Sequence, residues 1–173
     1  GSGLTVPGYD VAGVVSAIGS RVTQFSEGDR VIARTTSAYA EIVTAAADMS
    51  VLLPAPITPE TGVALITPGV TGYRMVELGK IKAGDTVIVK GASGGVGSAA
   101  IQLAVERGAS VIGIAASRHE AEVNRLGIEH FVAYDRGNPV DELRQTADVV
   151  INAAMNGLGG DDDVEMAKDG GLI

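Results

Sequence analysis

A glycine-rich segment at residues 91–97 constrains the fold of this chain more than any other feature of its sequence. It reads Gly-Ala-Ser-Gly-Gly-Val-Gly and lies between an apolar run typical of a buried strand, residues 86–90, and a stretch with helical periodicity. A dinucleotide pyrophosphate needs such a turn, because side chains must not block it and free N–H groups at a helix N-terminus must face its charge. We therefore expect Gly94 and Gly95 to let phosphates approach, and Gly97 to let the helix pack closely on the sheet.

Two other interpretations of this segment stay open. The spacing departs from G-x-G-x-x-G, so the nucleotide-binding prediction depends on the strand before the turn and the helix after it. Residues 91–95 also spell G-x-S-x-G, the nucleophile elbow of hydrolases, with Ser93 as the nucleophile. Only His119 and His130 follow as candidate bases, and both come too early in the sheet order. The third interpretation is a glycine-rich turn that binds no ligand.

The arrangement of predicted elements changes near residue 58. Before it come short β-type runs punctuated by glycine, and this stretch has too few residues to close a barrel. After it, helices and strands alternate as in a parallel sheet. Thr58-Pro59-Glu60 fits a helix start, with a cap, a proline in the first turn and an acid near the positive end of the dipole. The expected strands cover residues 11–18, 30–33, 38–43, 51–53, 86–90, 110–115, 130–134, 148–153 and 171–173. The expected helices cover residues 73–78, 96–107, 118–126 and 140–145, with a last one opening at residues 161–163.

Composition narrows the classes of partner. Lys and Arg number 13 against 21 Asp and Glu, a formal net charge of −8, and this acidic balance argues against a nucleic-acid partner. The chain has no cysteine and two histidines, which excludes disulfides and thiolate-bound zinc and leaves little for any other metal site. No apolar run approaches the roughly 20 residues of a membrane span. We expect a cytoplasmic protein with no metal and no membrane partner.

The residues after the second strand of the parallel sheet bear on which dinucleotide would bind. Enzymes that use NAD usually carry an acid at the end of this strand to hold the ribose 2′-hydroxyl. Here Ser117 and Arg118 follow the strand and the first carboxylate is Glu120, inside the next helix. A hydroxyl followed by a guanidinium suits a 2′-phosphate, and Tyr134 at the end of the third strand could add a phenolic donor. The sequence favours NADPH, although Arg118 as a solvated residue and Tyr134 as a packing residue remain the alternative.

Several segments along the chain form a set of motifs. They are Pro7-Gly8-Tyr9-Asp10 with Ala12-Gly13-Val14-Val15, Gly28-Asp29-Arg30-Val31, Tyr39-Ala40-Glu41, Thr71-Gly72-Tyr73, the 91–97 turn continuing to Gln102-Leu103-Ala104, and Gly170-Gly171-Leu172-Ile173. Together they resemble the medium-chain dehydrogenase/reductase superfamily, specifically its zinc-independent quinone oxidoreductase branch, over nearly the whole chain. One departure is Thr71-Gly72-Tyr73, where the family usually has Thr-Ala-Tyr, a change expected to be mild.

The resemblance implies a two-domain α/β protein. A partial GroES-like catalytic domain would occupy residues 1–58 and a Rossmann doubly wound parallel sheet residues 59–173, with NADPH in the cleft between them. The first part of the GroES-like domain and the end of the Rossmann sheet would be missing, so a fragment is expected. The cofactor-binding residues carried over from the family or expected from the turn are Thr71 near the nicotinamide, Ser93, Gly94, Gly95 and Val96 at the pyrophosphate, and Ser117, Arg118 and Tyr134 at the 2′-phosphate.

The resemblance also implies an activity. NADPH would transfer hydride to a quinone or an α,β-unsaturated carbonyl, and the family's frequent dimerisation through the sheet edge leaves a homodimer open. Tyr9 stands where zinc-dependent relatives have a ligand histidine, so catalytic zinc is not expected, and Asp10 is expected to serve the fold. No catalytic acid or base can be assigned. The alternative is a fragment that binds the nucleotide but catalyses nothing.

Overall fold

The computed structural model describes residues 6–154 and 160–173. The chain forms two compact units, residues 1–67 and 68–173. Helix α1 (Pro59–Leu78) runs across the division and begins where the sequence predicts, because the N–H of Thr61 donates to Oγ1 of Thr58 at 3.2 Å. The domain limits expected from the sequence, 1–58 and 59–173, meet at the start of this helix and stay a prediction.

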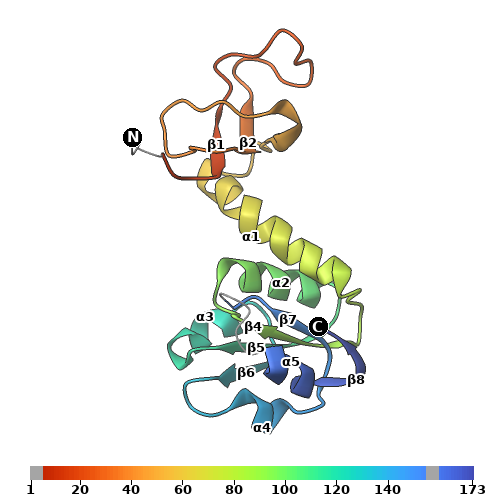
Figure 1. Ribbon diagram of the computed structural model, residues 1–173. Helices are drawn as coiled ribbons and strands as arrows, with labels where there is room; N and C mark the ends of the chain where they lie inside the picture. Colours follow the sequence, from red (N-terminus) through yellow and green to blue (C-terminus); the bar gives the residue numbers. More distant parts are fainter. Residues whose placement is uncertain (1–5, 155–159) are drawn as a thin grey trace, which may run out of the picture. The chain divides into compact units, whose positions relative to one another are not determined.

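The first unit contains a small antiparallel sheet in the order β1-β2-β3 (Figure 1). Its strands are β1 (Asp10–Val14), β2 (Arg30–Arg34) and β3 (Ser50–Leu52), and the short helix η1 (Ala47–Met49) precedes β3. The prediction of a strand up to residue 18 is wrong, because Val14 pairs with the first residue of β2 and the ladder ends there.

The strand predicted at residues 38–43 is also wrong. This segment forms bends rather than a strand, and Ser37 before it has a φ of 60°, which interrupts extended backbone. The N–H groups of Ala38 and Tyr39 donate to the carbonyls of Gly8 and Pro7, at 3.1 and 2.9 Å. The segment is therefore fixed against the residues that precede β1 instead of extending the sheet.

The second unit is a five-stranded parallel sheet in the order β6-β5-β4-β7-β8, with helices on both faces (Figure 1). The strands are β4 (Thr86–Lys90), β5 (Ser110–Ala115), β6 (His130–Ala133), β7 (Ala147–Asn152) and β8 (Ala167–Leu172). The helices besides α1 are α2 (Gly95–Glu106), η2 (Ser117–His119), α3 (Glu120–Asn124), α4 (Pro139–Leu143) and α5 (Gly160–Met166). This order confirms the predicted doubly wound fold, in which β4 and β7 flank the switch point and ligands bind beyond the carboxyl ends of the strands.

The sheet separates two apolar cores, which explains its continuous hydrophobic strands. On one face the side chains of α1, α2 and α3 meet alternate strand residues: Val76, Ala100, Ile101, Ala104 and Val123 against Val87, Val89 and Val111. On the other face α4 and α5 do the same: Val140, Leu143 and Met166 against Ile88, Ile112, Ile114, Val132 and Val150.

Several predicted boundaries shift by one residue in this unit, and three others change more clearly. The helix expected at residues 118–126 is shorter and begins with the 3₁₀ turn η2. Helix α4 has the predicted cap, since Oδ1 of Asn138 accepts from the N–H of Val140 at 3.2 Å, but it ends at Leu143, before Gln145 with its φ of 56°. The last strand begins at Ala167 instead of residue 171. None of the helices in the described ranges is both long and apolar enough to span a bilayer.

Helices α1 and α2 pack through a glycine. A Cβ placed on Gly72 would lie 2.9 Å from the backbone N of Ala100 and from Cβ of Ala99, closer than real Cβ atoms come. The departure at Thr71-Gly72-Tyr73 is therefore not mild in this chain, because the glycine allows the close approach of the two helices.

We expect Gly72→Ala to lower the free energy of unfolding. Alanine would gain about 0.5–1 kcal/mol from helix propensity, whereas the clash with backbone would cost about 1–3 kcal/mol, so the clash decides the sign. Urea denaturation of the chain measures the change, with Gly137→Ala as the control, since a Cβ at Gly137 would meet nothing within 4 Å. A stabilised Gly72→Ala variant would contradict the described packing.

A buried ion pair joins α5 to the two strands at the switch point. Nζ of Lys90 lies 2.6 Å from Oδ1 of Asp163, and the side chains are 13% and 2% exposed. Nδ2 of Asn152 donates to the other carboxylate oxygen at 2.7 Å, and Lys90 and Asn152 are direct partners across β4 and β7. The carboxylate of Asp163 thus fixes the carboxyl ends of both strands.

Removing this carboxylate should be far more costly than removing a surface one. Asp163→Ala leaves an ammonium in a buried site, and we expect a loss of about 3–5 kcal/mol in the free energy of unfolding. Glu165→Ala, which breaks an exposed ion pair with Arg144, should cost about 1 kcal/mol or less. Thermal and urea unfolding compare the two, and Lys90→Met combined with Asp163→Leu should regain much of the loss; equal effects of the two single changes would contradict the buried pair.

Candidate functional site

The glycine-rich turn places a bare helix N-terminus at the switch point. Gly94 is the N-cap of α2, with extended backbone at φ −79° and ψ 163°, and no side chain caps the helix. The first N–H groups of a helix have no partner within the helix, and Gly94 and Gly95 are exposed. These groups and the helix dipole form a site suited to an anion.

Contacts between backbone atoms hold the turn in shape. The N–H groups of Gly91 and Ala92 both donate to the carbonyl of Ile114 at 3.1 Å, which ties the turn to β5. A Cβ on Gly97 would lie 2.2 Å from the carbonyl oxygen of Gly91, and Gly91 itself has a φ of 73°. Gly97 therefore allows the helix to pack closely on the backbone of the turn itself, whereas its predicted packing on the sheet stays a prediction.

The bare turn also fits a pyrophosphate on its open side. A Cβ on Gly94 would approach only the carbonyl of Gly91, at 3.3 Å, so nothing else crowds the helix end at this residue. Gly95 has a second use that the sequence does not indicate, because a Cβ there would lie 3.1 Å from Cβ of Pro68 on α1. The residues present thus leave the space and the donors that a dinucleotide diphosphate requires.

Helix α1 brings Thr71 to the same end of α2. Pro68 lies beside Gly95, at 3.1 Å from where a Cβ on Gly95 would be, and a Cβ placed on Gly72 would lie 3.1 Å from the carbonyl oxygen of Val96. Thr71 lies between these contacts, so the structure brings together four of the predicted pyrophosphate residues and the residue predicted for the nicotinamide end. The roles of all of them remain predictions.

The residues predicted for the 2′-phosphate follow the neighbouring strands. Ser117 and Arg118 follow β5 after one intervening residue, Ala116. Tyr134 comes directly after β6, whose last residue pairs with Ala115. The N–H of Tyr134 donates to the carbonyl of Ala115 at 3.2 Å, while the residue is 56% exposed. Arg118 is exposed, and among the described residues none of the ion pairs involves it. Its guanidinium is available to a ligand.

The sequence analysis missed an acid at this position. The carboxylate of Asp135 accepts from the N–H of Ser117 at 2.8 Å and from its hydroxyl at 2.9 Å. These two hydrogen bonds, first the one from the backbone and then the one from the side chain, lower the pKa of Asp135 below its usual value. A carboxylate therefore stands at the end of β5 after all, contributed by the chain that leaves β6. The sequence does contain an indication of this acid, because Asp135 directly follows Tyr134, which is itself predicted to lie at the 2′-phosphate.

The histidines do not serve Ser93 as bases in this structure. Nδ1 of His119 lies 3.3 Å from a carboxylate oxygen of Glu122, and Nε2 of His130 lies 2.5 Å from one of Glu142. His130 also begins β6, so it lies at the edge of the sheet opposite to the glycine-rich turn. The geometry gives no support to the hydrolase interpretation.

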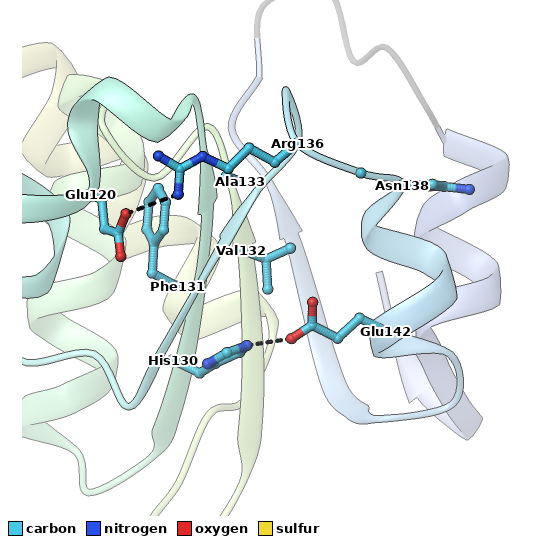
Figure 2. Close-up of a pocket in the computed structure, with 9 residues that line it drawn as sticks. Glu120, His130, Phe131, Val132, Ala133, Arg136, Asn138 and Glu142 are labelled. Atoms are coloured by element: carbon cyan, nitrogen blue, oxygen red, sulfur yellow. Dashed lines mark hydrogen bonds and ion pairs between the residues drawn. The ribbon is translucent and has the colours of Figure 1, made fainter.

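Two hollows of the described surface lie away from the glycine-rich turn. One of about 270 Å³ lies beside β6 and α4, where Arg136 pairs with Glu120 at 3.7 Å and His130 with Glu142 (Figure 2). Another of about 350 Å³ lies between the loop before β4, the start of β7 and β8. Neither includes a residue of the turn. Within residues 6–154 and 160–173, no group of three or more His, Asp or Glu side chains could hold a metal ion.

Comparison with known proteins identifies the two parts of the chain. Residues 3–56 match the model of the alcohol dehydrogenase GroES-like domain, and residues 95–173 match the model of the zinc-binding dehydrogenase family. The quinone oxidoreductase of Homo sapiens is 34% identical over 176 residues, which cover 96% of this chain and 51% of that protein. The chain thus spans about half the length of the curated relatives that it matches.

Solved structures agree with these matches. The quinone oxidoreductase of Coxiella burnetii superposes with a TM-score of 0.89 at 30% identity, over 96% of this chain and 54% of that one. A mycobacterial protein complexed with NADPH superposes with a TM-score of 0.75 at 29% identity, over 84% of this chain and 49% of that one. The predicted fold, a GroES-like part followed by a Rossmann sheet, is confirmed. The chain belongs to the quinone oxidoreductase-like branch of the medium-chain dehydrogenase/reductase superfamily.

Proposed function

We propose that this chain carries the nucleotide site of an NADPH-dependent oxidoreductase that reduces a quinone or an α,β-unsaturated carbonyl. The observation that carries the proposal is the uncapped N-terminus of α2, which opens beyond the carboxyl ends of β4 and β7. An anion-binding helix end at the switch point of a doubly wound sheet is the usual place for a dinucleotide diphosphate.

The chain's own residues would bind and orient the nucleotide. Backbone groups of residues 93–96 would hold the diphosphate, Arg118 and Tyr134 would hold the 2′-phosphate, and Thr71 would lie toward the nicotinamide. An exposed guanidinium is suited to phosphate because it donates two parallel hydrogen bonds. The bound nucleotide supplies the hydride, and the protein supplies orientation and exclusion of water.

The acceptor would be a small electron-poor molecule, reduced without zinc. The chain contains no cysteine, and Tyr9 takes the place of the ligand histidine of zinc-dependent relatives. The net charge of −8 argues against nucleic acid as a partner. Cytoplasmic location and assembly as a homodimer complete the proposal; no residue is assigned as a catalytic acid or base.

A second candidate function is nucleotide binding without catalysis. It is favoured by the length of the match, because the chain spans about half of its relatives and much of a substrate pocket could lie outside it. The two candidates share the nucleotide site and differ only in turnover.

Removing the guanidinium of Arg118 should weaken the binding of NADPH more than the binding of NADH. A hydrogen bond to a charged group contributes about 1.5–3 kcal/mol. We therefore expect Arg118→Ala to raise the dissociation constant of NADPH at least about tenfold and to leave that of NADH nearly unchanged. Fluorescence titration of the chain with both reduced nucleotides measures this. Arg125→Ala, which removes an exposed arginine at the end of α3, is the control. NADH binding as tight as NADPH and insensitive to Arg118→Ala would refute the NADPH assignment.

Turnover separates the two candidate functions. We expect the chain to oxidise NADPH when 1,4-benzoquinone or an enone is added, followed as the loss of nucleotide absorbance. Saturable binding of NADPH with no oxidation would contradict the reductase proposal and support the second candidate, nucleotide binding without catalysis. Labelling of Ser93 by a fluorophosphonate would instead revive the hydrolase interpretation.

A further inference from the structure

We infer that Asp135 is a specificity-determining residue, whose carboxylate weakens the preference for a 2′-phosphate and lets this chain accept NADH beside NADPH. The inference rests on the proposed function, because it concerns the ribose end of the same nucleotide site. It goes beyond the proposal in naming an acid that opposes Arg118.

The position of Asp135 carries the inference. The carboxylate accepts from the N–H and the hydroxyl of Ser117, at 2.8 and 2.9 Å, and Ser117 immediately precedes Arg118. Only Ala116 separates Ser117 from the end of β5, the region where NAD-dependent enzymes place their ribose-binding acid. In this fold the acid reaches that region from the next strand along the sheet.

The two hydrogen bonds also change what Ser117 can offer. Both of its donors are directed at Asp135, so its hydroxyl proton is not available to a phosphate oxygen. An ionised carboxylate has about four acceptor sites, and Ser117 occupies two of them. The remaining sites can accept from a ribose hydroxyl, which NADH has at the 2′ position and NADPH does not.

The charges around the site give the direction of the effect. Arg118 attracts a 2′-phosphate and Asp135 repels it, because like charges a few ångströms apart oppose each other even when partly solvated. Arg136, the next residue after Asp135, also attracts this carboxylate. Its guanidinium is shared with Glu120, with which it pairs at 3.7 Å (Figure 2). The low pKa of Asp135 keeps its carboxylate ionised at neutral pH.

A purely structural role for Asp135 is the alternative. The carboxylate could simply cap the 3₁₀ turn η2, whose first residue is Ser117. In that case its removal would change the stability of the turn and would affect both nucleotides alike. A role in specificity predicts instead that the ratio of the two dissociation constants changes.

The test is a titration of the 173-residue chain and its Asp135→Asn variant with NADPH and NADH, read by nucleotide fluorescence. Asparagine keeps the size and an acceptor for Ser117 but removes the charge. We expect the preference for NADPH over NADH to rise about two- to fivefold, the scale of one charge interaction at an exposed site. Asp141→Asn, which removes an exposed carboxylate from the first turn of α4, should leave the ratio unchanged. An unchanged ratio in Asp135→Asn would overturn the inference.

Two further variants make the outcome decisive. Asp135→Ser removes the same charge with a different side chain, and it should raise the preference for NADPH over NADH as Asp135→Asn does. Ser117→Ala removes one hydrogen bond and keeps the carboxylate, so a ratio that moves as far in this variant would assign the effect to the shape of the turn and overturn the inference. If the wild-type chain binds neither nucleotide, the proposed function fails and the inference fails with it. If it binds both and the ratio does not respond, only the inference fails.

Discussion

The close contact between α2 and the glycine-rich turn is the constraint on which the nucleotide site depends. The carbonyl oxygen of Gly91 lies where a side chain at Gly97 would be, at 2.2 Å from an ideal Cβ, so only glycine allows the helix to start there. This contact sets the N-terminus of α2 against the end of β4, with its first N–H groups uncapped. The buried carboxylate of Asp163 holds the carboxyl ends of β4 and β7 from the other face. A rigid edge with an open anion site is what a diphosphate requires.

The features that the sequence predicts well are local ones. The turn at residues 91–97, the strand before it and the helix after it depend on glycines, apolar runs and helical periodicity within a few residues. The structure has the turn, the strand and the helix. The doubly wound order follows from the alternation of helices and strands. The segment at residues 38–43 has β-type composition as well, yet its backbone is held by Pro7 and Gly8. Its conformation is decided by contacts that are distant in sequence, and composition does not reveal them.

The features that the sequence analysis missed all join residues that are far apart along the chain. Asp135 meets Ser117 because β5 and β6 are neighbours, and Lys90 meets Asp163 because α5 returns over the carboxyl end of β4. Gly72 was expected to be a mild departure from the family pattern, but its meaning depends on where α2 lies. The acid of NAD-dependent enzymes is expected at the end of the second strand, but a parallel sheet gathers the ends of all its strands at one edge. Asp135 follows the third strand and so lies at this same edge.

The central claim is that a dinucleotide diphosphate binds to the backbone at the start of α2. The most direct test records the amide NMR signals of the isotope-labelled chain during titration with NADPH. The account predicts saturable shifts centred on the amides of residues 93–97, with the amides that line the hollow beside β6 nearly unmoved. Saturation without any response at residues 93–97, or no saturable response at all, would contradict it.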